Sequence, residues 1–188
     1  MQQASAEPGI PDILTHMSIE AVKQGNSLWF RVVSNSMAPL IRCGDCVYIS
    51  SALAEELQTG AIAAFTTPQG LVIHRIVRSK QNTATIRLLQ MSDVELRPSW
   101  ITASSLRGRV TLIQRGELYI NLERPLARCY SAIAARLRYR FYRMHSFRSL
   151  RLVAHICSRL VAYLLCQRLC SQCSLADAYQ PHSAIKTK

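Results

Sequence analysis

The sequence predicts a mainly β protein, in which a compact β domain is followed by basic amphipathic α-helices. From residue 28 to residue 121, short apolar or alternating segments are separated by turn residues, which is typical of strands. After Pro125 the apolar residues recur every three or four positions, which is typical of helices. The charge changes at the same place: 11 basic residues against 10 acids through Glu123 leave +1, and 12 against one after it leave +11.

The length of 188 residues fits one folded domain with appendages better than two domains. We expect an N-terminal helical arm over 1–28, a β domain over 29–123, Arg-rich amphipathic helices over 124–176 and a flexible tail over 177–188. Two prolines, Pro8 and Pro11, interrupt the start of the arm, and a short helix is expected over 13–23.

Seven short strands are expected in the β domain. Glycine, proline, asparagine and aspartate residues mark the turns between most of them. The expected strands are 28–33, 46–49, 61–65, 71–77, 84–89, 108–113 and 117–121. Seven short strands with tight turns favour one compact β domain with a modest core.

Two basic helices are expected after the β domain, each with an apolar side and a cationic side. The apolar side of the first consists of Leu126, Tyr130, Ile133, Leu137, Phe141 and Met144. Its cationic side consists of Arg128, Arg136, Arg138, Arg140 and Arg143. The second has Leu150, Val153, Ile156, Leu160 and Leu164 on one side and Arg148, Arg151, His155 and Arg159 on the other.

Several classes of protein are disfavoured by what the sequence lacks. The N-terminus has neither the basic nor the apolar region of a secretory signal, and no apolar run is long enough for a conventional transmembrane helix. Seven cysteines form no regular disulfide framework, so reduced thiols are expected. Because Cys43-x-x-Cys46 has no second pair at zinc-finger spacing, we expect no metal and no cofactor.

The clearest chemical signal is the segment Ser34-Asn-Ser36-Met37-Ala-Pro39, which follows an apolar strand. A serine at the end of a strand, just before a turn that contains proline, can be held exposed at the lip of a sheet. A serine hydroxyl is a weak nucleophile at its ordinary pKa, so it needs a base within hydrogen-bond reach.

Two types of base are conceivable, a desolvated lysine or a histidine. Lys80 is the lysine nearest the strands, but it lies beside a turn, where it would stay solvated and charged. His74 lies in the middle of the otherwise apolar stretch 70–77, apart from Arg75. A histidine in such a strand can be a plain core residue; together with the serine motif it is the better candidate for a base.

Four motifs carry a resemblance to a known family: Ser36-Met37-x-Pro39, Arg42-x-Gly44-Asp45, Leu57-x-x-Gly60-Ala-Ile-Ala and His74-Arg75. In order and spacing they resemble the type I signal peptidases, and most closely the Ser/His branch of the endoplasmic-reticulum and archaeal enzymes. The resemblance covers about residues 29–110. It implies a β-rich catalytic domain over 29–123 and serine endopeptidase activity, with cleavage after small residues in an extended substrate.

The resemblance also implies roles for individual residues. By position, Ser36 matches the nucleophile and His74 the general base. Ser34 lies where some relatives place a hydroxyl of the oxyanion hole; the alternative is a turn-capping hydroxyl. Asp93 matches a family aspartate and would orient His74, the alternatives being a turn aspartate or Glu95 in its place.

The sequence departs from the family around Asp93. The glycine that the family places before this aspartate is Ser92, and the position of a second aspartate falls on Pro98 or Ser99. Such a weakened triad implies a slower or more specialised protease, or one that has lost activity.

The basic C-terminal helices suggest where the protein acts. An apolar stripe beside arginines favours an anionic membrane surface as partner, so we expect peripheral attachment on the cytoplasmic side. Nucleic acid and an acidic protein are the alternatives for this charge, and we consider nucleic acid the less favoured partner.

Together these observations predict a serine endopeptidase of the signal peptidase type, which removes a leader or signal segment from a peptide or protein precursor. One alternative is a LexA-like regulatory protein that cleaves itself. LexA-type repressors use a lysine base and an N-terminal DNA-binding domain, whereas this sequence offers His74 and only about 28 residues before the β domain. The other alternative is an inactive binding module of the same fold.

Overall fold

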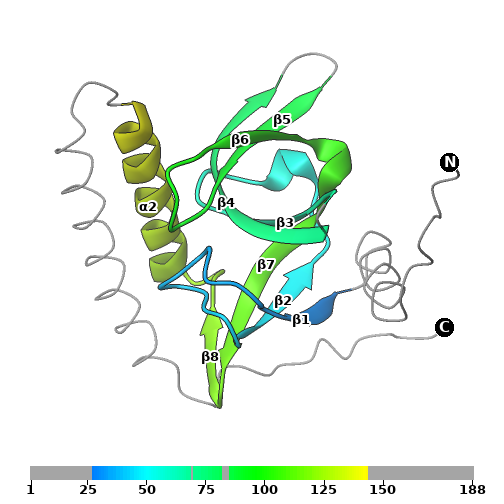
Figure 1. The fold of residues 1–188 in the computed structure, drawn as a ribbon, viewed down its shortest axis with the longest axis vertical. Helices are drawn as coiled ribbons and strands as arrows, with labels where there is room; N and C mark the ends of the chain where they lie inside the picture. The colour runs from blue at the N-terminus through cyan, green and yellow to red at the C-terminus, as the bar shows by residue number, and fades with distance from the viewer. Residues whose placement is uncertain (1–26, 69, 82–84, 144–188) are drawn as a thin grey trace, which may run out of the picture.

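The fold is a curled antiparallel β-sheet with one long helix packed beside it (Figure 1). It is seen in a computed structural model that describes residues 27–68, 70–81 and 85–143. The predicted arm helix over 13–23, the second basic helix and the tail over 177–188 lie outside the described residues. The mainly β class is confirmed; the boundaries of the four segments stay predictions.

Eight strands form a single sheet, in the order β1-β2-β7-β3-β4-β5-β6, with β8 also paired to β7. The strands are β1 (Leu28–Arg31), β2 (Cys46–Ser50), β3 (Ile62–Thr67), β4 (Gly70–Gln81), β5 (Ile86–Met91), β6 (Ser99–Thr102), β7 (Leu106–Arg115) and β8 (Leu118–Asn121). Two short 3-10 turns, η1 (Ala54–Glu56) and η2 (Ala103–Ser105), and the helix α2 (Pro125–Arg143) complete the described elements. All strand pairs are antiparallel.

The sheet curls because its longest strands pair with different neighbours along their length. One edge of β7 pairs first with β3 and then, from Leu112, with β8. Register shifts interrupt the β2–β7, β3–β7 and β4–β5 ladders. Such irregularities bend a strand and increase its twist. A Cβ on Gly108 would lie 2.3 Å from the Ser50 carbonyl oxygen, so only glycine lets β7 approach β2 this closely.

Each of the seven predicted strands overlaps an observed strand, and the sequence missed only β6. β6 follows Pro98, is four residues long and pairs only with β5, at the edge of the sheet. Such a short and mostly exposed strand has no clear alternation of apolar and polar residues. Its position is set by pairing with β5 and by the stacking of Arg87 on Trp100.

α2 forms where the first basic helix was predicted, and its buried residues come from both the predicted apolar side and the predicted cationic side. The buried residues of α2 are Ala127, Tyr130, Ser131, Ala135 and Arg138. Leu126, Ile133 and Leu137 of the predicted apolar side are exposed, whereas Tyr130 of that side and Arg138 of the predicted cationic side are buried. The backbone of α2 lies close against Gly60, where an added Cβ would come within 2.6 Å of the Ala132 nitrogen.

The main hydrophobic core lies between the sheet, the loop after β1 and α2. It contains Met37, Leu40, Ile41, Val47, Ile49, Ile62, Ala64, Val110, Ile113, Ile120, Leu122, Ala127 and Tyr130. A second cluster lies around Ala63, Ile76 and Leu88, and a third joins Val77, Leu89 and Met91 to Ala135. Within the described ranges, no helix has both the length and the apolar character needed to cross a bilayer.

Candidate active site

Ser36 lies at the start of a turn that follows β1, and its side chain is half-buried. Met37, the next residue, is buried in the main core and so attaches the turn to the core. The turn is closed by a hydrogen bond from the Ala38 N–H to the Asn35 carbonyl, and the Asn35 side chain accepts one from the Cys43 N–H. A buried neighbour and these bonds hold Ser36 in the turn, beyond the end of β1 at Arg31.

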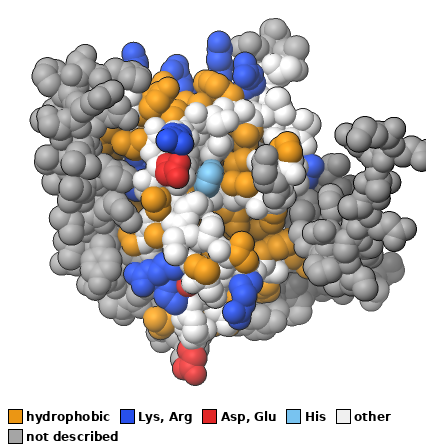
Figure 2. All heavy atoms as spheres, viewed as in Figure 1, with side chains coloured by type: hydrophobic (Ala, Val, Ile, Leu, Met, Phe, Trp, Pro, Cys, Tyr) orange, Lys and Arg blue, Asp and Glu red, His pale blue; other side chains and the backbone are white. Residues whose placement is uncertain are grey.

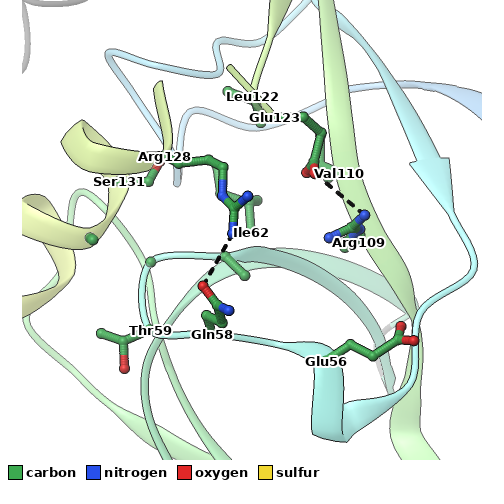
Figure 3. A pocket seen from close by; sticks show the side chains of 13 residues that line it. Glu56, Gln58, Thr59, Ile62, Arg109, Val110, Leu122, Glu123, Arg128 and Ser131 are labelled. Atoms are coloured by element: carbon green, nitrogen blue, oxygen red, sulfur yellow. Dashed lines mark hydrogen bonds and ion pairs between the residues drawn. The ribbon is translucent and has the colours of Figure 1, made fainter. Parts of the chain in front are cut away.

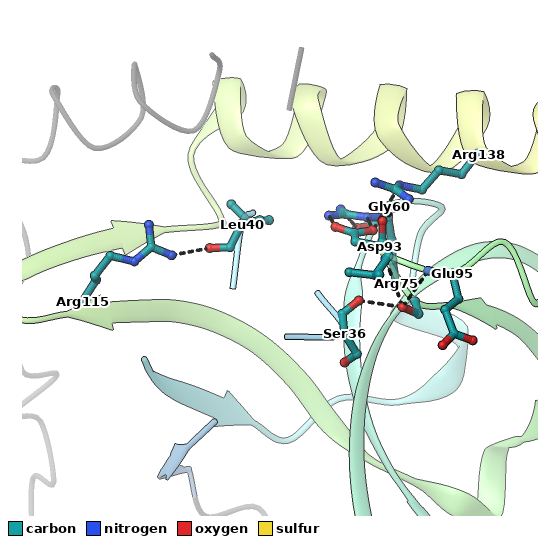
Figure 4. Close-up of polar contacts among 10 residues, drawn as sticks. Ser36, Leu40, Gly60, Arg75, Asp93, Glu95, Arg115 and Arg138 are labelled. Carbon is teal, nitrogen blue, oxygen red and sulfur yellow. Dashed lines mark hydrogen bonds and ion pairs between the residues drawn. The ribbon is translucent and has the colours of Figure 1, made fainter. Parts of the chain in front are cut away.

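The turn that follows β5 fixes the backbone of Ser36. The Ser36 carbonyl accepts hydrogen bonds from Ser92 Oγ at 2.6 Å, from the Asp93 N–H at 2.8 Å and from the Val94 N–H at 3.1 Å. Ser92 Oγ also accepts bonds from the N–H groups of Val94 and Glu95. Three donors on one carbonyl leave Ser36 little freedom to move relative to this turn, which Figure 4 shows below α2.

His74 lies in the middle of β4, half-buried, with its ring 6.0 Å from the Phe65 ring on the neighbouring strand. Its Nδ1 lies 2.6 Å from Oε1 of Gln90 on β5. Because the Cα partner of Gln90 is Ile76, His74 and Gln90 are diagonal neighbours on the same face of the sheet. Figure 2 shows a histidine side chain that reaches the surface between an acidic side chain and hydrophobic ones.

The contact with Gln90 selects one tautomer of the neutral imidazole. An amide oxygen accepts hydrogen bonds only, so Nδ1 carries the proton and Nε2 keeps its lone pair. Burial lowers the pKa of His74 below its ordinary value, and the bond to Gln90 and the carboxylates of Asp93 and Glu95 only partly offset this. The imidazole is therefore neutral at neutral pH, which is the form that a general base requires.

Asp93 is fully buried and is held by two arginines. Arg75 donates to it through Nε at 2.9 Å and Nη2 at 2.6 Å, in a bidentate pair. Arg138 of α2 lies 3.3 Å from Oδ1 through Nε and donates from Nη1 to the Asp93 carbonyl. Figure 4 shows the three side chains together beneath α2. Burial raises the pKa of Asp93, but the charge and hydrogen bonds of Arg75, with Arg138, outweigh it and hold this pKa below its ordinary value.

The partner at His74 Nδ1 differs from the one that the sequence predicts. The resemblance implies Asp93 in this place, whereas the structure places Gln90 there and pairs the Asp93 carboxylate with Arg75. The alternation of side chains along β4 explains the difference, because His74 and Arg75 point to opposite faces of the sheet. Glu95 is exposed, and its carboxylate acts on His74 only at longer range.

Ser34 is exposed, and its hydroxyl donates a hydrogen bond to Ser36 Oγ at 3.3 Å. The structure thus brings together the two serines of the motif. Ser36 and His74 do not hydrogen-bond to each other in this structure; such catalytic contacts often tighten only when substrate binds.

Asp45 is a structural residue of the same loop. Its carboxylate accepts a hydrogen bond from the Arg42 N–H and forms a bidentate pair with Arg115 at 2.9 and 2.7 Å. Arg115 also donates to the Leu40 carbonyl, so it ties the loop to β7 (Figure 4).

The described residues also form a pocket of about 200 Å³ between the segment after η1, β7 and the start of α2 (Figure 3). Two polar contacts cross it: Arg109 lies 3.4 Å from Glu123, and Arg128 donates to Gln58 at 3.2 Å. None of Ser34, Ser36, His74 or Gln90 lines it. The pocket is therefore separate from Ser36 and His74, and it forms no part of the candidate active site.

Sequence reasoning missed two residues of this region, Gln90 and Arg138. Gln90 is the one amide in the apolar strand β5, and a buried amide requires a hydrogen-bond partner, which was the available signal. Arg138 carried no such signal, because five arginines in one helix look equivalent until a buried carboxylate selects one.

The structure is a curled antiparallel sheet that carries a serine on a loop and a histidine on a strand. A family model described as Peptidase S24-like matches residues 4–103, more than half of the chain, and the chain belongs to this family. This confirms the relation to LexA-type and signal-peptidase-type proteins inferred from the sequence motifs. A search among curated proteins gives no match.

Proposed function

We propose that the protein is a serine endopeptidase of the signal peptidase type, which removes a leader or signal segment from a peptide or protein precursor. The observation that carries the proposal is the neutral His74, whose Nδ1–H donates to Gln90 Oε1 and leaves the lone pair on Nε2 as the acceptor. Ser36 supplies the nucleophile on a turn that is fixed by three hydrogen bonds to its carbonyl.

The reaction follows the chemistry of a serine and histidine pair. His74 Nε2 takes the proton of Ser36 Oγ while this oxygen attacks the scissile carbonyl carbon. The imidazolium then gives the proton to the leaving amine, and the carbon–nitrogen bond breaks. In the second half of the reaction, His74 takes a proton from water while the water oxygen attacks the ester carbon of the acyl-enzyme. The bond to Ser36 Oγ then breaks, and the proton returns to this oxygen, which releases the acid and regenerates Ser36.

Two further groups fit this mechanism. Ser34 Oγ, adjacent to Ser36 Oγ, is placed to donate to the developing oxyanion together with the Ser36 N–H. Gln90 orients the ring of His74 in the place that a carboxylate holds in Ser-His-Asp enzymes. Because an amide carries no charge, it stabilises the imidazolium less than a carboxylate would, which fits a specialised enzyme of modest rate.

The LexA-like alternative is disfavoured by the lack of a suitable lysine. Among the described residues the only lysine is Lys80, which is exposed near the end of β4. A lysine base needs burial to lower its pKa. Burial lowers the pKa of His74, so this side chain is neutral at neutral pH without the large shift that a lysine would need.

The proposal is tested by incubating the purified full-length protein with synthetic extended peptides that carry small residues, and by mass spectrometry of the products. We expect cleavage that Ser36→Ala and His74→Ala each abolish. The matched control is Ser79→Ala, an exposed serine on β4, which should leave cleavage unchanged.

The same spectra distinguish the alternatives. Cleavage of the chain itself, at a rate independent of its concentration, would support the LexA-like function instead. Cleavage that survives in both Ser36→Ala and His74→Ala would refute the serine mechanism, and intact peptides with the unaltered protein would favour the inactive module.

A further inference from the structure

We propose that α2 docks on an anionic lipid surface through its outer face, defined as Leu126, Cys129, Ile133, Arg136, Leu137, Arg140 and Arg143. The inference concerns where the protein acts and goes beyond the proposed peptidase activity. It stands on the packing, exposure and charge of α2.

The packing of α2 decides which side faces outward. Ala127, Ser131 and Ala135 are buried at a spacing of four residues, so they form one inner stripe. Arg138, on the same inner side, is held by Asp93. The opposite side of the helix therefore faces away from the sheet.

Three large apolar side chains lie on that outward side. Leu126 is 63%, Ile133 45% and Leu137 36% exposed. Isolated exposed leucines are ordinary on protein surfaces. Here the three residues are spaced by seven and then four positions, which places them in a single stripe along the helix. Exposed apolar residues gathered on one side and bordered by polar ones are typical of surfaces that contact a partner or a membrane.

Three exposed arginines lie beside this stripe, namely Arg136, Arg140 and Arg143. α2 contains five arginines and no acidic residue. In an ordinary surface helix, the apolar side is packed on the core and only the charged side meets solvent. In α2 the exposed half is itself divided into an apolar strip and a basic strip.

This division matches an anionic lipid surface. A helix that lies in the membrane interface buries its apolar strip at the boundary of the acyl chains and places its basic strip among the headgroup phosphates. Guanidinium groups pair with phosphates in a bidentate manner. A nucleic acid would satisfy the arginines equally well, but it would leave the leucine and isoleucine side chains against water. The lipid surface is therefore the occupant that uses both strips.

Cys129 offers a direct test, because it is exposed on the outer face between Leu126 and Ile133. In the full chain, the other six cysteines are replaced by serine and an environment-sensitive fluorophore is attached to Cys129. We expect a blue shift with phosphatidylcholine–phosphatidylserine vesicles and none with phosphatidylcholine alone. The matched control keeps only Cys43, which is exposed in the Ser36 loop and should show no shift.

Two sets of substitutions in the full chain test the strips separately. Leu126→Ser with Ile133→Ser and Leu137→Ser removes the apolar strip, and Arg136→Gln with Arg140→Gln and Arg143→Gln removes the basic strip. The arginine set should weaken vesicle binding roughly 100-fold, because each charge near the surface contributes about a factor of five and three are removed. Removal of the same charge elsewhere, by Arg31→Gln, Lys80→Gln and Arg97→Gln, should change binding no more than a few-fold.

Several results would overturn the inference. One is a Cys129 probe that does not respond while the protein floats with the vesicles, because residues 144–188 also contain arginines and would then account for binding. Another is an equal loss of binding in the control set and in the arginine set. Tighter binding to duplex DNA than to the anionic vesicles would replace the lipid surface by nucleic acid. Thermal melts show that each variant is folded, which is expected of the leucine, isoleucine, arginine and lysine substitutions because those side chains are exposed.

Discussion

Arg75 and Asp93 form a fully buried ion pair, in which Arg75 Nη2 lies 2.6 Å from Asp93 Oδ2. Arg75 is the neighbour of His74 on β4, and the Asp93 N–H donates to the Ser36 carbonyl. The pair therefore links the strand that holds the histidine to the turn that holds the serine. Arg138 adds α2 to the same link.

The first prediction concerns this link. Asp93→Asn removes the charge that Arg75 and Arg138 face, and an uncompensated buried charge costs about 3–5 kcal/mol of the free energy of unfolding. Urea denaturation followed by circular dichroism measures the loss.

The control for this prediction replaces the whole group. Arg75→Met, Asp93→Leu and Arg138→Met together remove all three buried charges and should recover most of the lost free energy, because apolar groups need no desolvation. A triple variant that is less stable than Asp93→Asn would show that packing, and not the unpaired charge, causes the loss.

The second prediction concerns Gln90. Gln90→Ala removes the acceptor at His74 Nδ1, so the imidazole no longer favours the tautomer with Nε2 free. Since positioned general bases contribute about 10²- to 10⁴-fold to rate, we expect kcat to fall by on the order of 10- to 100-fold with little change in KM. Peptide cleavage kinetics measure both constants. Gln90→Glu keeps an acceptor oxygen and should restore much of kcat; equal defects in the two variants would argue against an orienting role.

The third prediction is the pH dependence of cleavage. The base must be neutral, so kcat/KM falls as the pH falls through the pKa of His74. Burial lowers this pKa from its ordinary value of 6.5, so the midpoint of the acidic limb should lie below pH 6.5. In Gln90→Glu an added carboxylate raises the pKa and should move the limb to higher pH. A midpoint above 6.5 in the unaltered protein would contradict the neutral histidine.

The fourth prediction concerns the contact between Gly60 and α2. Gly60 has a φ of +103°, and an added Cβ would lie 2.6–2.8 Å from backbone atoms of Ser131 and Ala132. Gly60→Ala should therefore separate α2 from the sheet and lower the melting temperature strongly. Gly116→Ala is the control, because Gly116 also has a positive φ of +59° but nothing within 4 Å of its Cβ position. It should cost only about 1–2 kcal/mol, the backbone penalty of a left-handed residue. Equal losses in both variants would mean that the approach of α2 is not the cause.

Much of the fold was predictable because it depends on local patterns. Alternating apolar residues predicted seven of the eight strands, and the serine motif and His74-Arg75 predicted the residues that the structure places on the β1 turn and on β4. The packing side of α2 was not predictable in this way. Leu126 and Ala127 both fit a helix pattern, and only the orientation of α2 against the sheet decides that Ala127 is buried and Leu126 exposed.

The sequence by itself determined the class of the protein: a β domain with a candidate nucleophile and base, and a C-terminal excess of positive charge. These are properties of residue types and spacings along the chain. Only the tertiary structure decided that Gln90, and not Asp93, contacts His74 Nδ1, and that Asp93 pairs with Arg75. The physical reason is that adjacent side chains of a strand face opposite sides of the sheet, so the partners of His74 and Arg75 depend on how β5 and α2 pack on each side.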